Sequence, residues 1–63
     1  MAKRIVKNIR HNEKMMQILS SYKGMPRFHK ACRLVSDEAS RLNAKLTYGE
    51  TVSIASRLLF VCG

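Results

Sequence analysis

Apolar side chains recur about every three or four positions along most of this chain, which is the spacing of helices that bury one face. A strand in the first third would place Lys7 on the same side as Ile5 and Ile9, which argues against alternation. The helical stripe of this segment, widened by Met15 and Tyr22, comprises Ile5, Ile9, Asn12, Met16 and Leu19. The pattern predicts a helix from about residue 3 to residue 23.

A later start for this helix is equally consistent with the sequence. Asn12 is a favourable N-cap, and Glu13 would then lie in the first turn, where a negative charge suits the helix dipole. Residues 1–11 would in that case form a flexible basic arm. Both versions end near Gly24, because glycine readily adopts the left-handed conformation that ends helices, and both starts remain open.

A second helix is predicted over residues 26–45. Pro26 suits the first turn of a helix, where its missing N–H costs nothing. Its apolar stripe comprises Phe28, Ala31, Cys32, Val35, Ala39, Leu42 and Leu46. On the outer face, the spacing predicts ion pairs of Asp37 with Arg33 and with Arg41.

A third helix is predicted over residues 48–62. Thr47 and Glu50 have the spacing of a capping box, which marks a helix start. The predicted buried face comprises Val52, Ala55, Leu59 and Cys62. Further apolar residues fall outside that face, so the segment is apolar nearly all round. Residues 58–62 are also rich enough in β-formers for a short terminal strand, which is the alternative.

These elements predict one small all-α domain of three helices covering residues 1–63. A chain of 63 residues buries a small core, and such cores commonly need a second subunit, a metal or a disulfide. The surplus of apolar residues near the C-terminus favours a second subunit. We therefore expect a homodimer whose interface includes Leu58, Leu59, Phe60 and Val61.

Charge changes this picture, because it is divided unevenly along the chain. Twelve Lys and Arg oppose four Asp and Glu, for a net charge of +8. Residues 1–35 hold nine of the cations and one acid, which leaves +8, whereas residues 36–63 hold three of each sign, which leaves zero. One end is cationic and the other is neutral and apolar.

The cationic half favours a surface that neutralises phosphates, because a surface serving solubility alone normally mixes both signs. We expect a small non-enzymatic protein, a regulator or accessory factor, that binds DNA or RNA. Its size and charge also fit a phage or plasmid gene product. The expected contacts with phosphates are Lys3, Arg4, Lys7, Arg10, Lys14, Lys23, Arg27, Lys30 and Arg33.

Two alternatives and one refinement accompany this hypothesis. The same cations, with the methionines, also suit a protein-interaction module that docks an acidic or larger partner. A solvated helix face is the simpler alternative. Aromatic rings among cations can stack on single-stranded bases. Phe28 is expected in the core, and for Tyr22 both roles, packing in the protein and stacking on a base, remain open. Membrane contact is not expected, because the first segment lacks Trp and Phe.

Enzymatic, metal and secreted classes are not expected. The four acids occupy helix starts or expected ion pairs, and no Gly-rich phosphate loop or nucleophile motif is present. His29 and Cys32 lack the paired spacing of a zinc site, so we expect no metal or cofactor and place Cys32 in the core. With no secretory signal and no apolar run near ~20 residues, the expected location is the cytoplasm.

Overall fold

The structure, a computed structural model, describes the backbone of residues 2–62 and the side chains of residues 2–60. Within residues 2–62 it contains helices α1 (Ala2–Arg10), α2 (Glu13–Ser20), α3 (Met25–Arg41) and α4 (Tyr48–Cys62), and no strand. The all-α prediction is confirmed. The predicted count of three helices is wrong, because the first segment is divided in two. The alternative of a strand at residues 58–62 is also wrong, since α4 continues through them.

The division between α1 and α2 lies at His11 and Asn12. Asn12 has extended backbone angles, φ −99° and ψ 105°, and its side-chain oxygen accepts a hydrogen bond from the Met15 N–H at 3.1 Å. Asn12 is therefore the N-cap that the sequence predicted. The residues before it are not an arm, because Ile5, Val6 and Ile9 anchor α1 in the core.

Gly24 has the predicted positive φ, but it begins α3 instead of ending the helix before it. α2 ends at Ser20, before the predicted end at residue 23. Gly24, with φ 69° and ψ −141°, directly precedes α3, and its carbonyl accepts hydrogen bonds from the N–H groups of Arg27 and Phe28. The residue thus reverses the chain and starts α3 instead of ending the helix before it.

Helix α3 ends at Arg41, four residues before the predicted end at residue 45, and Asn43 forms the turn that follows it. The φ of Asn43 is 61°, and the Ala44 N–H donates to the Ala39 carbonyl at 2.8 Å while the Asn43 N–H donates to Ser40 at 3.0 Å. This pair of bonds is a Schellman motif, in which asparagine replaces the usual glycine. Leu46 consequently lies in the α3–α4 loop, half-buried against the core.

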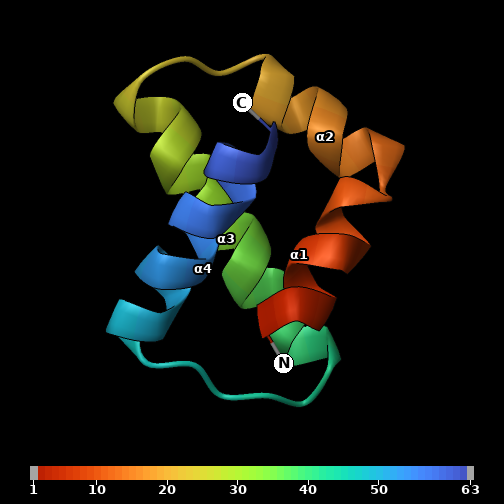
Figure 1. Cartoon of the computed structure of the whole chain (residues 1–63), viewed down its shortest axis with the longest axis vertical. Helices are drawn as coiled ribbons and strands as arrows, with labels where there is room; N and C mark the ends of the chain where they lie inside the picture. Colours follow the sequence, from red (N-terminus) through yellow and green to blue (C-terminus); the bar gives the residue numbers. More distant parts are fainter. Residues whose placement is uncertain (1, 63) are drawn as a thin grey trace.

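Helix α3 forms the centre of the fold (Figure 1). It runs antiparallel to α1 and α4, which pack on it and contact each other, while α2 continues from the end of α1 and also contacts α3. The molecule measures 28 × 22 × 17 Å. The seam between α1 and α4 joins two parallel helices that are far apart in sequence.

The core fills the space among α1, α3 and α4. Its buried residues are Ile5, Val6, Ile9, Leu19, Ala31, Leu34, Val35, Ala39, Ile54, Ala55 and Leu58. The buried face of α4 is centred on Ile54, Ala55 and Leu58, so the predicted face through Val52 and Leu59 is rotated from the observed one. Among the described residues, no helix combines the length and apolar content that crossing a membrane requires.

Glu38 is a buried acid that the periodicity did not single out. It is 4% exposed, and its carboxylate accepts a hydrogen bond from the Asn8 amide of α1 at 3.1 Å. Arg41 lies 3.5 Å from the other carboxylate oxygen, in the only ion pair among the side chains of residues 2–60. The predicted pairs of Asp37 with Arg33 and Arg41 are therefore not formed in the described structure.

Candidate nucleic-acid interface

The α1–α4 groove is a hollow along the seam between α1 and α4. It has a volume of about 180 Å³ and is lined by Lys3, Val6, Lys7, Arg10, His11 and Arg57. Lys3, Lys7 and Arg10 occupy positions i, i+4 and i+7 of α1 and so share one face. Four permanent cations therefore border one groove that contains no acid.

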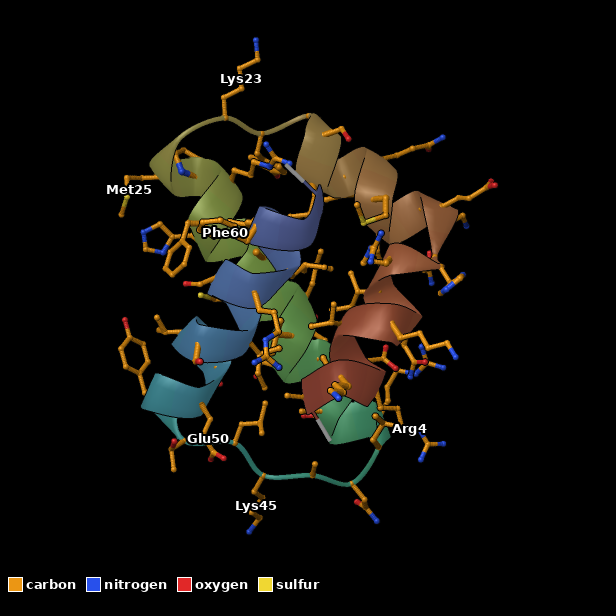
Figure 2. The ribbon with its side chains drawn as sticks, in the orientation of Figure 1. Arg4, Lys23, Met25, Lys45, Glu50 and Phe60 are labelled. Atoms are coloured by element: carbon orange, nitrogen blue, oxygen red, sulfur yellow. The ribbon has the colours of Figure 1, made fainter. Side chains whose placement is uncertain are left out.

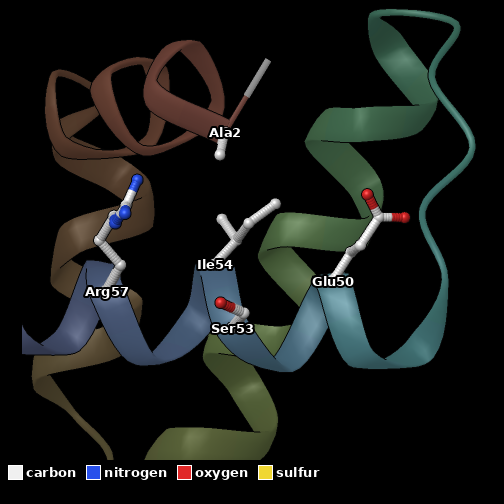
Figure 3. A pocket seen from close by; sticks show the side chains of 5 residues that line it. All are labelled: Ala2, Glu50, Ser53, Ile54 and Arg57. Atoms are coloured by element: carbon white, nitrogen blue, oxygen red, sulfur yellow. The ribbon is translucent and has the colours of Figure 1, made fainter.

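The packing of α1 and α4 explains this gathering. Val6 is buried and belongs to the core, so the lysines that flank it are held at the edge of the contact between the helices. Arg57 is the sole cation of α4, and it directly precedes the buried Leu58. Figure 3 shows the Arg57 side chain extending from α4 toward α1. The Arg57 guanidinium thus lies beside the cations of α1, although α1 and α4 are at opposite ends of the sequence.

A second hollow, of about 210 Å³, continues the seam beyond Arg57 (Figure 3). Its remaining lining residues are Ala2, Glu50, Ser53 and Ile54. The Thr47 N–H donates to the Glu50 carboxylate at 3.0 Å, which, with the Thr47 side chain, lowers the pKa of Glu50. Glu50 thus brings a negative charge to this second hollow, whereas the lining of the α1–α4 groove contains no acid.

The Tyr22 hollow is the third, with a volume of about 410 Å³. It lies between the α2–α3 loop and the first half of α3 and is lined by Tyr22, Pro26, His29, Lys30 and Arg33. Lys30 and Arg33 are among the expected phosphate contacts, and Tyr22 was open to a role in base stacking. Phe28 is half-buried against the core, as its position in the apolar stripe suggested.

The remaining predicted cations lie outside these hollows. Lys14 belongs to α2, so the break at Asn12 separates it from the α1 row. Arg4 is one turn before Asn8 and shares the α1 face that meets α3. Lys23 extends from the α2–α3 loop, far from Arg4 (Figure 2). Arg27 is half-buried on α3.

Two members of the α1–α4 groove were not predicted from the sequence, Arg57 and His11. A signal for Arg57 was present, because it is the single cation of a helix whose apolar residues lie nearly all round. A charged residue retained in such a helix marks the edge of its buried face. His11 offered no comparable signal, since its place in the groove depends on the break that ends α1.

The four residues of the predicted dimer interface have different environments. Leu58 is fully buried in the core of its own chain, and Leu59 is half-buried. Phe60 is 89% exposed. The side chain of Val61 lies outside the described residues. Among the three of these side chains that the structure describes, Phe60 is the most exposed.

Other chemistry is sparse in the described part of the chain. His, Cys, Asp and Glu side chains do not gather there in any group of three or more. Cys32 is a free thiol packed against the core, and burial raises its pKa, which favours the unreactive protonated form. Comparison of the chain with family models, with curated proteins and with solved structures finds no match.

Proposed function

We propose that this protein is a non-enzymatic nucleic-acid-binding protein, a regulator or accessory factor, that contacts phosphates through the α1–α4 groove. The observation that carries the proposal is the convergence of Lys3, Lys7, Arg10 and Arg57 on one hollow with no acid in its lining. A solubility surface has no reason to collect charges of one sign from two helices, because their repulsion costs stability.

The spacing of the groove also suits a phosphate backbone. Lys3 and Arg10 are separated by about 10 Å along α1, at ~1.5 Å per residue. One nucleic-acid strand carries a phosphate about every 3.4 Å of helix axis, so the row, laid along that axis, spans roughly three phosphate steps of one strand. Such contacts add affinity through the release of counterions and carry little sequence information.

The test is the salt dependence of binding, measured by mobility shift or fluorescence anisotropy with duplex and single-stranded oligonucleotides. We expect affinity to fall as salt rises. Lys7→Gln and Arg57→Gln should each reduce the slope of log affinity against log salt by about one. The matched control is Lys45→Gln, the same change of charge in the exposed α3–α4 loop, which should leave the slope unchanged. Absence of binding to either form at low salt would reject the proposal.

A second candidate is a protein contact through exposed apolar side chains, either with a second copy of this chain or with an acidic partner. Phe60 and Met25 are 89% and 65% exposed, and a small protein rarely exposes several large apolar side chains without use. Sedimentation equilibrium at high micromolar concentration tests the homodimer. A mass of 7.2 kDa would reject it, whereas twice that mass, lost in Phe60→Asp, would support it. A pull-down from lysate that survives nuclease and returns one acidic protein would favour the heterologous partner.

A further inference from the structure

We infer that the Tyr22 hollow is a base-stacking subsite, through which the protein prefers single-stranded nucleic acid, DNA or RNA, over duplex. This inference rests on the proposed function, because it adds a contact with bases to the contact with phosphates. It concerns a part of the surface on α3 and the α2–α3 loop, separate from the α1–α4 groove.

The wall of this hollow is one continuous face of α3. Pro26, His29, Lys30 and Arg33 occupy positions i, i+3, i+4 and i+7, the spacing of residues that share a helix face. An outward face of a helix is normally charged and flexible. This one instead combines an apolar pyrrolidine ring and a planar imidazole with two cations, so it offers ring surfaces as well as charge.

Tyr22 completes the hollow from the opposite side. Its N–H donates to the Leu19 carbonyl at 3.1 Å, which fixes the start of the loop. The positive φ of Gly24 then reverses the chain toward α3, so that Tyr22 faces the residues that follow the turn. The residue is 39% exposed. Part of it is held by the protein, and the remainder is accessible to a ligand.

His29 is also held in place while it remains exposed. Its ring meets the Phe28 ring edge to face, with centroids 6.5 Å apart and planes at 70°. Phe28 in turn packs against the core, so the imidazole is supported by a fixed neighbour. Two aromatic rings and a proline therefore line a hollow more than twice the volume of the α1–α4 groove.

The cations of the hollow suit the phosphates beside a stacked base. Neither Lys30 nor Arg33 forms an ion pair among the side chains of residues 2–60, where the only pair joins Glu38 and Arg41. Asp37, one turn beyond Arg33, is the nearest acid on this face and lies outside the lining. A base in a duplex already stacks on its neighbours, so aromatic stacking selects for single strands.

The test compares one sequence as single-stranded DNA, single-stranded RNA and duplex. Tyr22→Ala should weaken binding to at least one single strand by roughly 5- to 150-fold, the range expected for one base on an aromatic ring. Tyr22→Phe should retain affinity within about twofold, because it keeps the ring. Binding to the duplex should be unchanged in both variants. Circular dichroism of each variant confirms that it folds.

Fluorescence gives a second readout that does not depend on the folding of Tyr22→Ala. The chain has no Trp and two Tyr, so in Tyr48→Phe the emission comes from Tyr22 alone. Tyr48 is exposed at the start of α4 and outside the Tyr22 hollow. We expect a single strand to quench the Tyr22 emission and an equal concentration of bound duplex to leave it unchanged.

The outcomes separate this inference from the function on which it rests. If the unsubstituted protein binds none of the three nucleic acids at low salt, both the proposed function and the stacking subsite are overturned. If Lys7→Gln and Arg57→Gln weaken binding while Tyr22→Ala has no effect and Tyr22 emission is not quenched, phosphate binding stands and the stacking subsite is rejected. Quenching and Tyr22-dependent affinity with DNA, with RNA or with both support the subsite, and the responsive strand identifies the sugar.

Discussion

Gly24 and Gly49 are exposed glycines with opposite backbone requirements. Gly24 has φ 69° and ψ −141°, a conformation in which a Cβ would be strained, whereas Gly49 lies within the first turn of α4. A Cβ added at either position meets no atom within 4 Å. Any difference between substitutions at the two sites therefore reports backbone conformation alone.

We predict opposite effects for the two glycine-to-alanine changes. Gly24→Ala should lower the free energy of unfolding by about 1–3 kcal/mol, the cost of a residue held in a sparsely allowed region. Gly49→Ala should raise it by up to about 1 kcal/mol, because alanine loses less backbone entropy in a helix. Urea titration followed by circular dichroism measures both. Equal effects would show that the turn at Gly24 is not formed.

Glu50 makes stability depend on pH through the capping box of α4. The Thr47 N–H donates to its carboxylate at 3.0 Å, and the Glu50 N–H donates to the Thr47 hydroxyl oxygen at 3.2 Å. The interactions with Thr47 lower the pKa of Glu50 below its ordinary value of 4.5. Since the folded-state pKa is lowered, the stabilisation is present above the ordinary value and is lost as pH falls through the lowered one.

Glu50→Gln tests this charge, because glutamine can still reach the Thr47 N–H. The variant should melt at a lower temperature than the parent at neutral pH, and the difference should shrink and disappear as pH falls below 4.5 and through the lowered pKa of Glu50. Glu50→Ala, which removes the hydrogen bond as well, should melt lower than Glu50→Gln at neutral pH. A difference in melting temperature that is independent of pH would contradict the role of the charge.

Most of the residues that cap helices could be identified from the sequence. Asn12, Thr47 and Glu50 cap helices through hydrogen bonds to residues three positions away, so neighbouring residue types reveal them. Asn43 was not recognised, because asparagine adopts a positive φ less often than glycine and the apolar stripe continues beyond it to Leu46.

At the scale of elements, one polar contact helps to set how α1 packs on α3. The Asn8 amide donates to the Glu38 carboxylate, and among the described side chains this is the only hydrogen bond between two helices. Glu38 is nearly fully buried, while the Arg41 side chain beside it is 70% exposed. The buried Glu38 carboxylate therefore depends on the half-buried Asn8 for a hydrogen bond, because its other partner is mostly exposed.

Asn8→Ala should reduce the free energy of unfolding by about 1–3 kcal/mol, because it leaves a buried carboxylate with a missing donor. Arg41→Gln is the control, and it should cost less than about 1 kcal/mol, since exposed ion pairs contribute little. Adding Glu38→Leu to Asn8→Ala should recover part of the loss, because the orphaned charge is then removed. Chemical denaturation measures the free energy of unfolding of all three variants. Equal losses for Asn8→Ala and Arg41→Gln would contradict the role of Asn8 as the main partner of the buried carboxylate.

The faces of the helices were predictable to different degrees. The stripe of α3 was mostly right, because polar residues separate its apolar positions, although Leu34 was missed. The stripe of α4 was right at Ala55 but missed Ile54 and Leu58, because apolar residues surround that helix and periodicity leaves several faces equivalent. Contact with α1 and α3 selected Ile54, Ala55 and Leu58.

At the scale of the whole molecule, the net charge of +8 acts within a body only 28 Å long. The Debye length is about 30 Å at 0.01 M salt and about 8 Å at 0.15 M. At low salt, therefore, nearly every cation repels every other one, and the described part of the chain holds a single ion pair. This repulsion destabilises the compact state.

We predict that salt acts oppositely on stability and on binding. The melting temperature should rise between about 0.01 M and 0.15 M sodium chloride, as screening weakens repulsion, while affinity for nucleic acid falls. The double variant Lys14→Glu and Lys23→Glu lowers the net charge from +8 to +4 at exposed sites outside the hollows. Its melting temperature should depend less on salt. A parent protein whose melting temperature falls with salt would contradict this account.

The helical class and most helix starts follow from the amino-acid sequence alone, because they depend on residues within about one turn of each other, and the division of charge is a property of the sequence itself. Three features emerge only from the packing of the helices: which face of α4 is buried, the burial of Glu38, and the contact of Arg57 with the cations of α1. These three features depend on contacts between residues far apart in the chain. Side-chain spacing within one helix carries no information about which helix will lie beside it.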